Sequence, residues 1–173
     1  VIVVGGGPAG MMAGGRAAEK GAKVILIEKN ETLGKKLLIT GGGRCNVTNF
    51  EFDTRKFLEK FKTDGKFLFS AFSQWSVKET LDFFHVRGMA TKVENESRVF
   101  PTSDLARSVL DVLAEYMRKH GVKVLSKSPV VEIVRENNVL VGVKLKNKKV
   151  IRGRSIVIAT GGISRPETGS TGD

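Results

Sequence analysis

The sequence predicts an α/β fold with a central parallel sheet, and three observations support this prediction. An apolar run at 1–4 leads through a glycine-rich turn into a helical pattern, and a second apolar run at 23–28 follows. A helical crossover between two strands makes them pair in parallel. Short alternating runs after residue 121 predict an antiparallel β-meander, and a last apolar run at 155–162 suits a central parallel strand.

The first helix is expected to begin in the glycine-rich turn and to end near Gly21, because glycine commonly ends helices. Gly14 and Gly15 stand inside this helix, where each costs about 1 kcal/mol relative to Ala. We interpret them as positions of close packing of the helix on the sheet, and the alternative is a tolerated defect of the helix. Between 54 and 87, phenylalanines and leucines recur at helical spacing, which predicts helices whose aromatic side chains belong to the core rather than to an aromatic cofactor box, the alternative.

A long amphipathic helix is predicted to follow Ser103, whose hydroxyl would cap it, and to close at Gly121. The runs after it are typical of short strands joined by tight turns. Asn137 and Asn138 mark one hairpin turn and Asn147 marks a second. We assign four runs to the meander, at 122–125, 128–136, 138–146 and 148–152.

The length of 173 residues with 40% hydrophobic residues fits one globular domain with its own core. The chain begins at Val1 inside an apolar run and ends on turn residues, so we expect it to be the N-terminal part of a longer protein. No run approaches the roughly 18 apolar residues of a membrane span, and no leader pattern is visible. The single cysteine, Cys45, excludes a disulfide or a CxxC pair within the chain and favours a reducing cytoplasm.

The formal net charge of +11 and the pI near 10.0 raise the question of a nucleic-acid partner. The densest basic segment is 144–154, where Lys144 and Lys146 alternate with apolar residues on a predicted strand. We interpret this segment as the solvated face of a hairpin. The alternatives are a nucleic acid, an anionic ligand or an acidic domain elsewhere in the protein. Few aromatic residues accompany the basic ones, so we do not expect a nucleic-acid partner.

The glycine pattern at 5–10 predicts a dinucleotide-binding site. Gly5 would allow the tight turn after the strand, Gly7 would let a pyrophosphate approach the backbone, and Gly10 would permit close packing of the helix on the sheet. The helix N-terminus would offer N–H groups and partial positive charge to the phosphates. Glu28 ends the second strand, where its carboxylate would accept hydrogen bonds from ribose hydroxyls. The alternative is a glycine-rich turn on an ordinary α/β sheet.

NAD and FAD share this fingerprint, so the choice between them needs other features. A domain that binds only NAD usually continues with helical crossovers. A meander inserted before a later central strand instead resembles the Rossmann-like FAD/NAD(P)-binding domain of glutathione-reductase type. Together with ATGG at 159–162 and GGGRCN at 41–46, the meander favours FAD.

Three segments carry a closer resemblance: 1–49, which ends in KKLLITGGGRCNVTN, then ESRVFPTSDLARSVLDVL at 96–113 and IVIATGGISRPETGSTGD at 156–173. They resemble the BaiN-like flavoprotein oxidoreductases, which are also labelled the aminoacetone oxidase family. The resemblance runs along the whole chain. Gly14 and Gly15 in the first helix, and Ser97 where glycine would be usual, are small departures from it.

The resemblance implies a cytoplasmic FAD-binding protein with a small-molecule substrate and no membrane association. Residues 1–173 would be the first part of the FAD domain, and the missing C-terminal half of the same protein would be its partner. Matched by position, the glycine turn would hold the pyrophosphate, Glu28 and Lys29 the ribose, and the backbone of Val131 the adenine. Lys36 and the 41–46 loop would line the flavin side. The residues so assigned are Gly5, Gly7, Pro8, Ala9, Gly10, Glu28, Lys29, Lys36, Gly41, Gly42, Gly43, Arg44, Cys45, Asn46, Val131, Ala159, Thr160 and Gly161.

Elementary chemistry suggests a task for the GGGRCN loop. Bare backbone at Gly41–Gly43 would let amide donors approach a planar ring or a phosphate. Arg44 would bring positive charge to a reduced flavin or a substrate carboxylate, and Asn46 would hydrogen-bond the flavin edge. We expect Cys45 to be a packing residue. The alternatives are a charge-transfer partner or nucleophile for Cys45 and, for the whole loop, a turn shaped only by packing.

These observations lead to the prediction of an FAD-dependent oxidoreductase. Hydride would pass from NAD(P)H to flavin N5 and then to an organic acceptor or dioxygen. Arg44 and Arg98 are the candidates for substrate-side charge, and no metal site is predicted. The alternatives are an NAD(P)-dependent dehydrogenase without flavin and a non-catalytic dinucleotide-binding module, acting as a redox sensor or a nucleic-acid partner.

Overall fold

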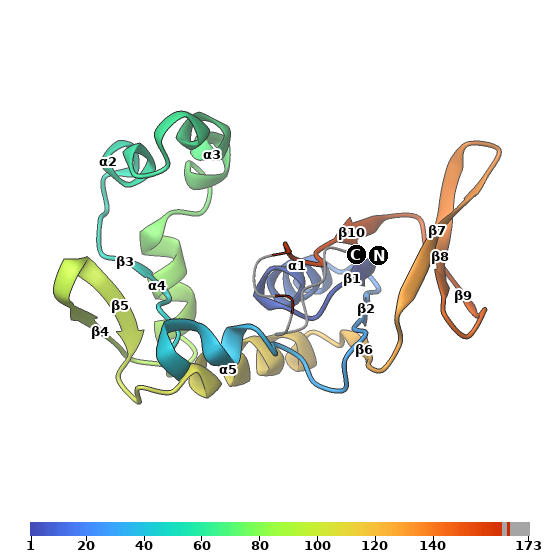
Figure 1. The fold of residues 1–173 in the computed structure, drawn as a ribbon, viewed down its shortest axis with the longest axis horizontal. Coiled ribbons are helices and arrows are strands. Elements are labelled where there is room, and N and C mark those ends of the chain that lie inside the picture. The colour runs from blue at the N-terminus through green and yellow to red at the C-terminus, as the bar shows by residue number, and fades with distance from the viewer. Residues whose placement is uncertain (164–165, 167–173) are drawn as a thin grey trace. The chain divides into compact units, whose positions relative to one another are not determined.

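The computed structural model describes residues 1–163 and 166, and the chain divides into two compact units (Figure 1). The first unit comprises the described residues of Val1–Leu37 and Leu113–Asp173. The second unit is Leu38–Val112. No helix among the described residues has both the length and the apolar character needed to cross a membrane.

The first unit contains a parallel sheet of four strands, β1 (Ile2–Val4), β2 (Ile25–Ile27), β6 (Lys123–Leu125) and β10 (Ile156–Ile158). Their order is β10-β1-β2-β6, and every neighbouring pair is parallel. Helix α1 (Pro8–Glu19) makes the crossover from β1 to β2, as the sequence predicts. Two expectations need correction: the run at 122–125 joins this sheet rather than the meander, and β10 lies at an edge of the described strands rather than at the centre.

The meander consists of β7 (Val130–Glu136), β8 (Val139–Leu145) and β9 (Val150–Arg152), all antiparallel. Asn137 and Asn138 join the first two strands with φ of 50° and 61°. Asparagine tolerates this left-handed backbone better than most residues, which confirms the predicted tight turn. The second turn at Asn147 is confirmed too, because its Oδ1 accepts the Lys149 N–H at 3.1 Å.

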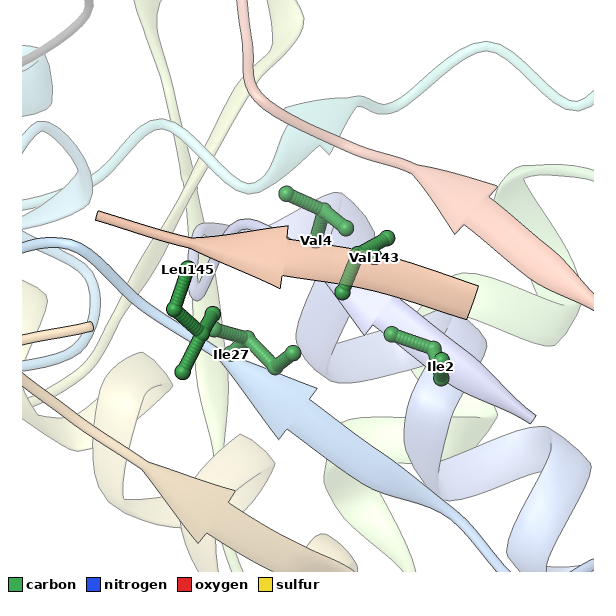
Figure 2. Close-up of a cluster of buried hydrophobic side chains, with 5 residues drawn as sticks. All are labelled: Ile2, Val4, Ile27, Val143 and Leu145. Atoms are coloured by element: carbon green, nitrogen blue, oxygen red, sulfur yellow. The ribbon is translucent and has the colours of Figure 1, made fainter. Parts of the chain in front are cut away.

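The two faces of the parallel sheet are covered by different elements, because successive side chains of a strand point to opposite sides. Ile2, Val4 and Ile27 point to the meander and form a buried cluster with Val143 and Leu145 of β8 (Figure 2). Burying each such side chain contributes about 1.5–3 kcal/mol. On the other face, Val3 and Leu26 lie under α1 near Gly14. The meander and α1 therefore fix the sheet from both sides.

Gly14 and Gly15 differ in the reason for their small size. A Cβ at Gly14 would sit 3.7 Å from Val24 and Val3, which is ordinary contact with the sheet. A Cβ at Gly15 would lie 2.4 Å from the ring of Tyr116, on helix α5 (Ala106–Lys119). The close approach that we expected between helix and sheet is therefore one between two helices, and only Gly15 requires it.

Helix α5 begins later than predicted. Ser103 Oγ accepts the Leu105 N–H at 3.3 Å in a local turn, but the helix starts only at Ala106, so Ser103 is not its N-cap. At the other end, Gly121 has φ of 74° and its N–H donates to the Arg118 carbonyl. That left-handed residue ends the helix as predicted.

The second unit combines helices with a small antiparallel sheet. Its sheet has the order β3-β5-β4, from β3 (Thr48–Asn49), β4 (Thr91–Glu94) and β5 (Arg98–Pro101). Short segments of 3₁₀ type are η1 (Leu37–Gly43), η2 (Lys62–Asp64) and η3 (Asn95–Ser97). Non-helical backbone interrupts η1 at Thr40, Gly41 and Gly42, and η3 at Glu96. Its predicted helices are confirmed as α2 (Thr54–Glu59), α3 (Gly65–Phe72) and α4 (Val77–His85).

The core of the second unit is smaller than its aromatic content suggests. Val77, Leu81 and Val99 form a buried cluster with Phe57 packed against it. Phe83 and Phe84 are buried, as predicted, but Phe67 is 88% exposed, so the prediction of core phenylalanines holds for only part of 54–87. Helical spacing places these rings on a helix face, but η2 and α3 have no described layer over that face.

Candidate dinucleotide-binding site

A pocket of about 530 Å³ opens in the first unit where β1, β2 and β10 end. Crevices at the carboxyl ends of parallel strands are the usual ligand sites of such sheets. All of its lining residues belong to the first unit: Val4, Gly5, Gly6, Gly7, Pro8, Ala9, Ile27, Glu28, Lys29, Asn30, Gly34, Lys35, Lys36, Ser128, Pro129, Val130, Val131, Ala159, Thr160, Gly161 and Gly162.

The glycine turn has the backbone geometry that its spacing predicts, and the contact of Gly7 with a pyrophosphate stays a prediction. Gly5 has φ of 108°, and a Cβ there would lie 2.2 Å from the Ala159 carbonyl oxygen. A Cβ on Gly10 would lie 1.9 Å from the Gly5 carbonyl oxygen, so the helix packs directly on the turn and Gly10 lies beneath the pocket wall. A Cβ on Gly7 would meet no described atom within 4 Å, which leaves open space above its backbone.

Helix α1 presents an uncapped N-terminus to this space. Gly7 is the N-cap residue, Pro8 occupies the first turn, and no side chain accepts a hydrogen bond at the cap. The first turn also contains no acidic residue. Free N–H groups and the helix dipole therefore favour an anion beside Gly7 and Ala9.

Glu28 is 7% exposed, and its carboxylate holds the glycine turn by hydrogen bonds. Its Oε2 accepts the Gly6 N–H at 2.7 Å, and its Oε1 accepts the Asn30 N–H at 2.8 Å and Asn30 Nδ2 at 2.6 Å. A carboxylate has about four acceptor positions, so capacity for a ligand hydroxyl is left. Glu28 therefore has a structural task in addition to the ribose contact that the sequence predicts.

Gly6 is the main site residue that sequence reasoning missed. A Cβ there would lie 2.9 Å from Glu28 Oε2 and 2.4 Å from Leu33 Cδ2, so a larger residue would have to displace both side chains. Its carbonyl accepts the Gly34 N–H at 2.9 Å, which ties the 30–34 segment to the turn. The three consecutive glycines at 5–7 were a usable signal, because the dinucleotide pattern itself requires only the outer two. The other missed lining residues are Val4, Ile27, Asn30, Gly34, Lys35, Ser128, Pro129, Val130 and Gly162.

Three further residues of the predicted site, Lys29, Lys36 and Val131, also line the pocket. Lys29 and Lys36 line it and add positive charge to its wall. Val131 lines it at an irregularity of β7, because the register with β8 shifts between Val130 and Glu132. A bulged residue is left outside the regular ladder, so its backbone is suited to pair with a ligand.

The segment after β10 closes the pocket. The Ala159 N–H donates to the Val4 carbonyl at 2.8 Å, which places Ala159, Thr160 and Gly161 directly against the glycine turn. The structure thus brings these three residues into one pocket with the predicted residues of the glycine turn and of the end of β2. The last part of the motif string, at 164–165 and 167–173, lies outside the described residues.

The GGGRCN loop belongs to the second unit, where its glycines have a conformational reason. Gly41, Gly42 and Gly43 have φ of 57°, 66° and 86°, and Cys45 follows with 61°. Residues with a Cβ are strained in this region, so the run of glycines is needed to form the left-handed turn itself. Gly41 is also held close to Asn46 and Phe100, at 2.9 and 3.0 Å from a Cβ position.

Arg44 makes more contacts within the second unit than we expected. Its Nη1 donates to both carboxylate oxygens of Glu94, at 2.9 and 3.0 Å, and to Asp104 at 3.3 Å. Its guanidinium lies 4.1 Å from the centre of the Phe100 ring. Lys92 hydrogen-bonds Asp104 and, with Arg44, holds the pKa of that carboxyl below its usual value. The charge of Arg44 is thus already compensated within the second unit, and its role toward a ligand stays a prediction.

The remaining loop residues show structural contacts as well. With its amide oriented as its neighbours require, Asn46 donates to the carbonyls of Thr48 at 2.8 Å and Val99 at 3.2 Å. Cys45 is a buried free thiol, and burial raises its pKa, as suits the packing role that we expected. Arg98 donates from Nε to the Asn95 carbonyl at 3.1 Å. The flavin contacts assigned to the loop, and the substrate-side charge assigned to Arg98, remain predictions.

The fold and the pocket together define a Rossmann-like dinucleotide-binding domain, and the predicted α/β fold class is confirmed. The family described as "HI0933-like protein Rossmann domain" matches residues 1–173. The chain belongs to this family.

Curated relatives include the ribosomal RNA dihydrouridine synthase of Escherichia coli, 30% identical over 98% of this chain and 41% of that protein. The 3-dehydro-bile acid delta(4,6)-reductase of Clostridium scindens is 37% identical over 70% of this chain and 29% of that protein. The chain therefore spans less than half the length of these relatives.

Solved structures show the same fold. The 3-ketosteroid-delta4-(5alpha)-dehydrogenase from Rhodococcus jostii superposes with a TM-score of 0.71 at 19% identity, over 94% of this chain and 45% of that one. A flavocytochrome c3 fumarate reductase gives a TM-score of 0.71 at 23% identity, over 93% of this chain and 33% of that one.

Proposed function

We propose that the protein containing this chain is an FAD-dependent oxidoreductase and that the first unit holds the adenosine and pyrophosphate parts of the cofactor. The observation that carries the proposal is the pocket, where open space above Gly7, an uncapped helix N-terminus and the buried Glu28 converge. The family assignment and the names of the relatives support the same conclusion.

The residues of the pocket fit FAD part by part. Open space at Gly7 and the N–H groups of α1 suit the pyrophosphate, and the remaining acceptor capacity of Glu28 suits the ribose hydroxyls. The irregular backbone at Val131 suits the adenine edge. A phosphate on the 2′-hydroxyl would meet the Glu28 carboxylate, so this end of the site favours a nucleotide without one.

The reaction that we propose is reduction of a carbon–carbon double bond conjugated with a carbonyl group. The names of the two relatives above describe this change, one on a uridine base and one on a bile acid. A further relative is the NADH:fumarate oxidoreductase of Klebsiella pneumoniae, 26% identical over 95% of this chain, and fumarate also carries such a bond. When bound, FAD would supply the two-electron chemistry of this step. The residues of this chain bind and orient the cofactor.

Several finer assignments belong to this proposal. We infer NAD(P)H as the electron donor and a BaiN-like relationship within the family. A cytoplasmic location and cooperation with a further part of the same protein are inferred too. A small organic enone is the first candidate substrate. A uridine in ribosomal RNA is the second, and the net charge of +11 specifically favours it.

The test is an absorption spectrum of the purified full-length gene product, with the cofactor released by heat and identified by mass. Bound FAD that bleaches under anaerobic NADH or NADPH, and recovers its colour on adding an enone or a uridine-containing RNA, is the expected result. A protein that neither holds nor takes up FAD would refute the proposal and leave the flavin-free dehydrogenase as the better account. FAD that no nicotinamide reduces would remove only the proposed donor.

A further inference from the structure

The positive charge of the chain is concentrated in the first unit. Its two segments contain eighteen Lys and Arg against eight Asp and Glu, a net charge of +10, whereas the second unit has eleven against ten, a net charge of +1. Residues 118–154 alone contain eleven Lys and Arg against two Glu. The basic character is therefore a local property of the segment that forms β6 and the meander.

The two glutamates of this segment, Glu132 and Glu136, form ion pairs with basic residues of the meander. Glu132 pairs with Lys144 at 3.0 Å and Glu136 with Arg152 at 2.8 Å, both between neighbouring strands of the meander. Lys146, Lys148 and Lys149 make up most of the exposed β8–β9 turn, and among the described residues none of the three has an ion pair. We call these three lysines the basic turn.

The basic turn is held in one backbone conformation. The Lys148 N–H donates to the Leu145 carbonyl, and the Leu145 N–H donates to the Lys149 carbonyl, both at 2.9 Å. Lys148 has φ of 68°, where asparagine or glycine is preferred. The Lys148 side chain has no hydrogen bond or ion pair among the described residues, so its charge has no structural partner there.

The turn lies at the rim of the dinucleotide pocket. The Lys146 N–H donates at 2.8 Å to the carbonyl of Pro129, which lines the pocket. The pyrophosphate of a dinucleotide carries two negative charges, and Lys29, Lys35 and Lys36 already line that pocket. The three lysines of the basic turn are thus additional to the positive charge that the cofactor requires.

We propose that the basic turn binds the phosphate backbone of an RNA that is the substrate of the enzyme, which replaces our sequence-based interpretation of 144–154 as a solvated face without a nucleic-acid partner. This inference rests on the proposed function, because it selects the RNA candidate over the small enone. Lysines without ion pairs, carried on a fixed turn, give sequence-independent attraction to a nucleic acid. A lipid surface is the less suitable partner, since a membrane-binding element pairs its cations with large apolar side chains and the turn at 146–149 contains none.

The experiment compares the full-length FAD-loaded protein with the triple variant Lys146→Gln, Lys148→Asn, Lys149→Gln. Asparagine at 148 suits the left-handed backbone, so the turn is expected to stay folded. The matched control is Lys56→Gln, Lys62→Asn, Lys66→Gln, which removes the same charge from exposed positions of the second unit and also places asparagine at its one left-handed position, Lys62 with φ of 52°. The ligand is a labelled ribosomal RNA fragment, titrated from about 50 to about 200 mM salt.

If each lysine contacts one phosphate, the slope of log affinity against log salt falls by about 2 to 3 in the triple variant. Over this salt range the unaltered protein then loses roughly 20- to 40-fold more affinity than the triple variant. The control variant should keep the full slope. Equal slopes in all three proteins, or an equal fall in the control, would overturn the proposal, as would binding to anionic phospholipid vesicles without binding to RNA.

The absorbance of FAD in the same samples separates this inference from the function on which it rests. A protein that holds FAD but shows no dependence of RNA binding on the turn refutes the basic turn as an RNA surface and leaves the oxidoreductase intact. A protein that binds RNA through the turn but holds no FAD refutes the oxidoreductase and leaves the surface intact.

Discussion

Replacing Glu28 with alanine should weaken FAD binding and loosen the glycine turn, and the two effects can be measured separately. The lost charge-assisted hydrogen bond to the ribose is worth about 1.5–3 kcal/mol, or about a ten- to hundredfold loss of affinity. The turn loses its own acceptor as well, because Gly6 and Asn30 donate three hydrogen bonds to this carboxylate at 2.6–2.8 Å.

The structural cost should appear without any cofactor. A buried N–H that loses its acceptor costs about 1–3 kcal/mol, which lowers the melting temperature of a chain of this size by roughly 2 to 12 °C. The apoprotein is therefore melted with and without the substitution, and FAD affinity is measured by titration at a temperature where both forms are folded.

The control is Glu31→Ala, three residues away. Glu31 is exposed and pairs with the exposed Lys127 at 2.6 Å, and such pairs contribute about 0 to 1 kcal/mol. A Glu28 variant that binds FAD like this control refutes the ribose assignment. A Glu28 apoprotein that melts like this control refutes the anchoring role, whatever its affinity for FAD.

Three further outcomes follow from the glycines and the thiol. Gly42→Val should lower both the thermal stability and the FAD affinity, because a β-branched residue is strained at φ of 66°, whereas Gly42→Asn should keep the stability. An Asn variant that binds FAD normally would contradict the need for bare backbone. A Val variant as stable as the Asn variant would contradict the strain. Gly14→Ala should stabilise the protein by up to about 1 kcal/mol in thermal melts, and Gly15→Ala should destabilise it by about 1–3 kcal/mol through the ring of Tyr116; equal effects would contradict the packing described. Burial raises the pKa of the Cys45 thiol, so iodoacetamide at neutral pH should label it far more slowly in the native protein than in urea, and fast native labelling would favour the nucleophile alternative.

Much of the first unit could be predicted from local sequence because its elements are marked by their period and by turn residues. The glycine pattern, Glu28 and the segment at Ala159 follow strands that end at one edge of a parallel sheet, so their meeting in one pocket was predictable from topology. The prediction for the run at Lys123–Leu125 is wrong since short apolar strands look alike in parallel and antiparallel sheets. Only its distant partner β2 determines the choice.

The errors in the second unit have a different physical cause. Periodicity correctly places Phe67 on a helix, but it cannot show whether another layer covers that helix face. The charge of Arg44 looks available in the sequence because Glu94 and Asp104 lie fifty and sixty residues further along the chain. In the sequence, the glycines at 41–43 suggest that space is kept for a ligand. Their positive φ values give a second explanation for glycine at these positions, and the sequence alone cannot distinguish the two explanations.

The register of β1 has a consequence for how the chain folds during synthesis. Ile2 pairs with Ile25 on one side and with Ile156 on the other. One edge of β1 therefore stays unpaired until about 150 further residues have been synthesised. At about 5–20 residues per second the ribosome needs roughly 8 to 30 s to deliver that strand. Ala159 and Thr160 arrive with it, so the pocket is completed only then. The cofactor therefore cannot guide the early steps of folding, and the nascent β1 edge needs protection from aggregation in the meantime.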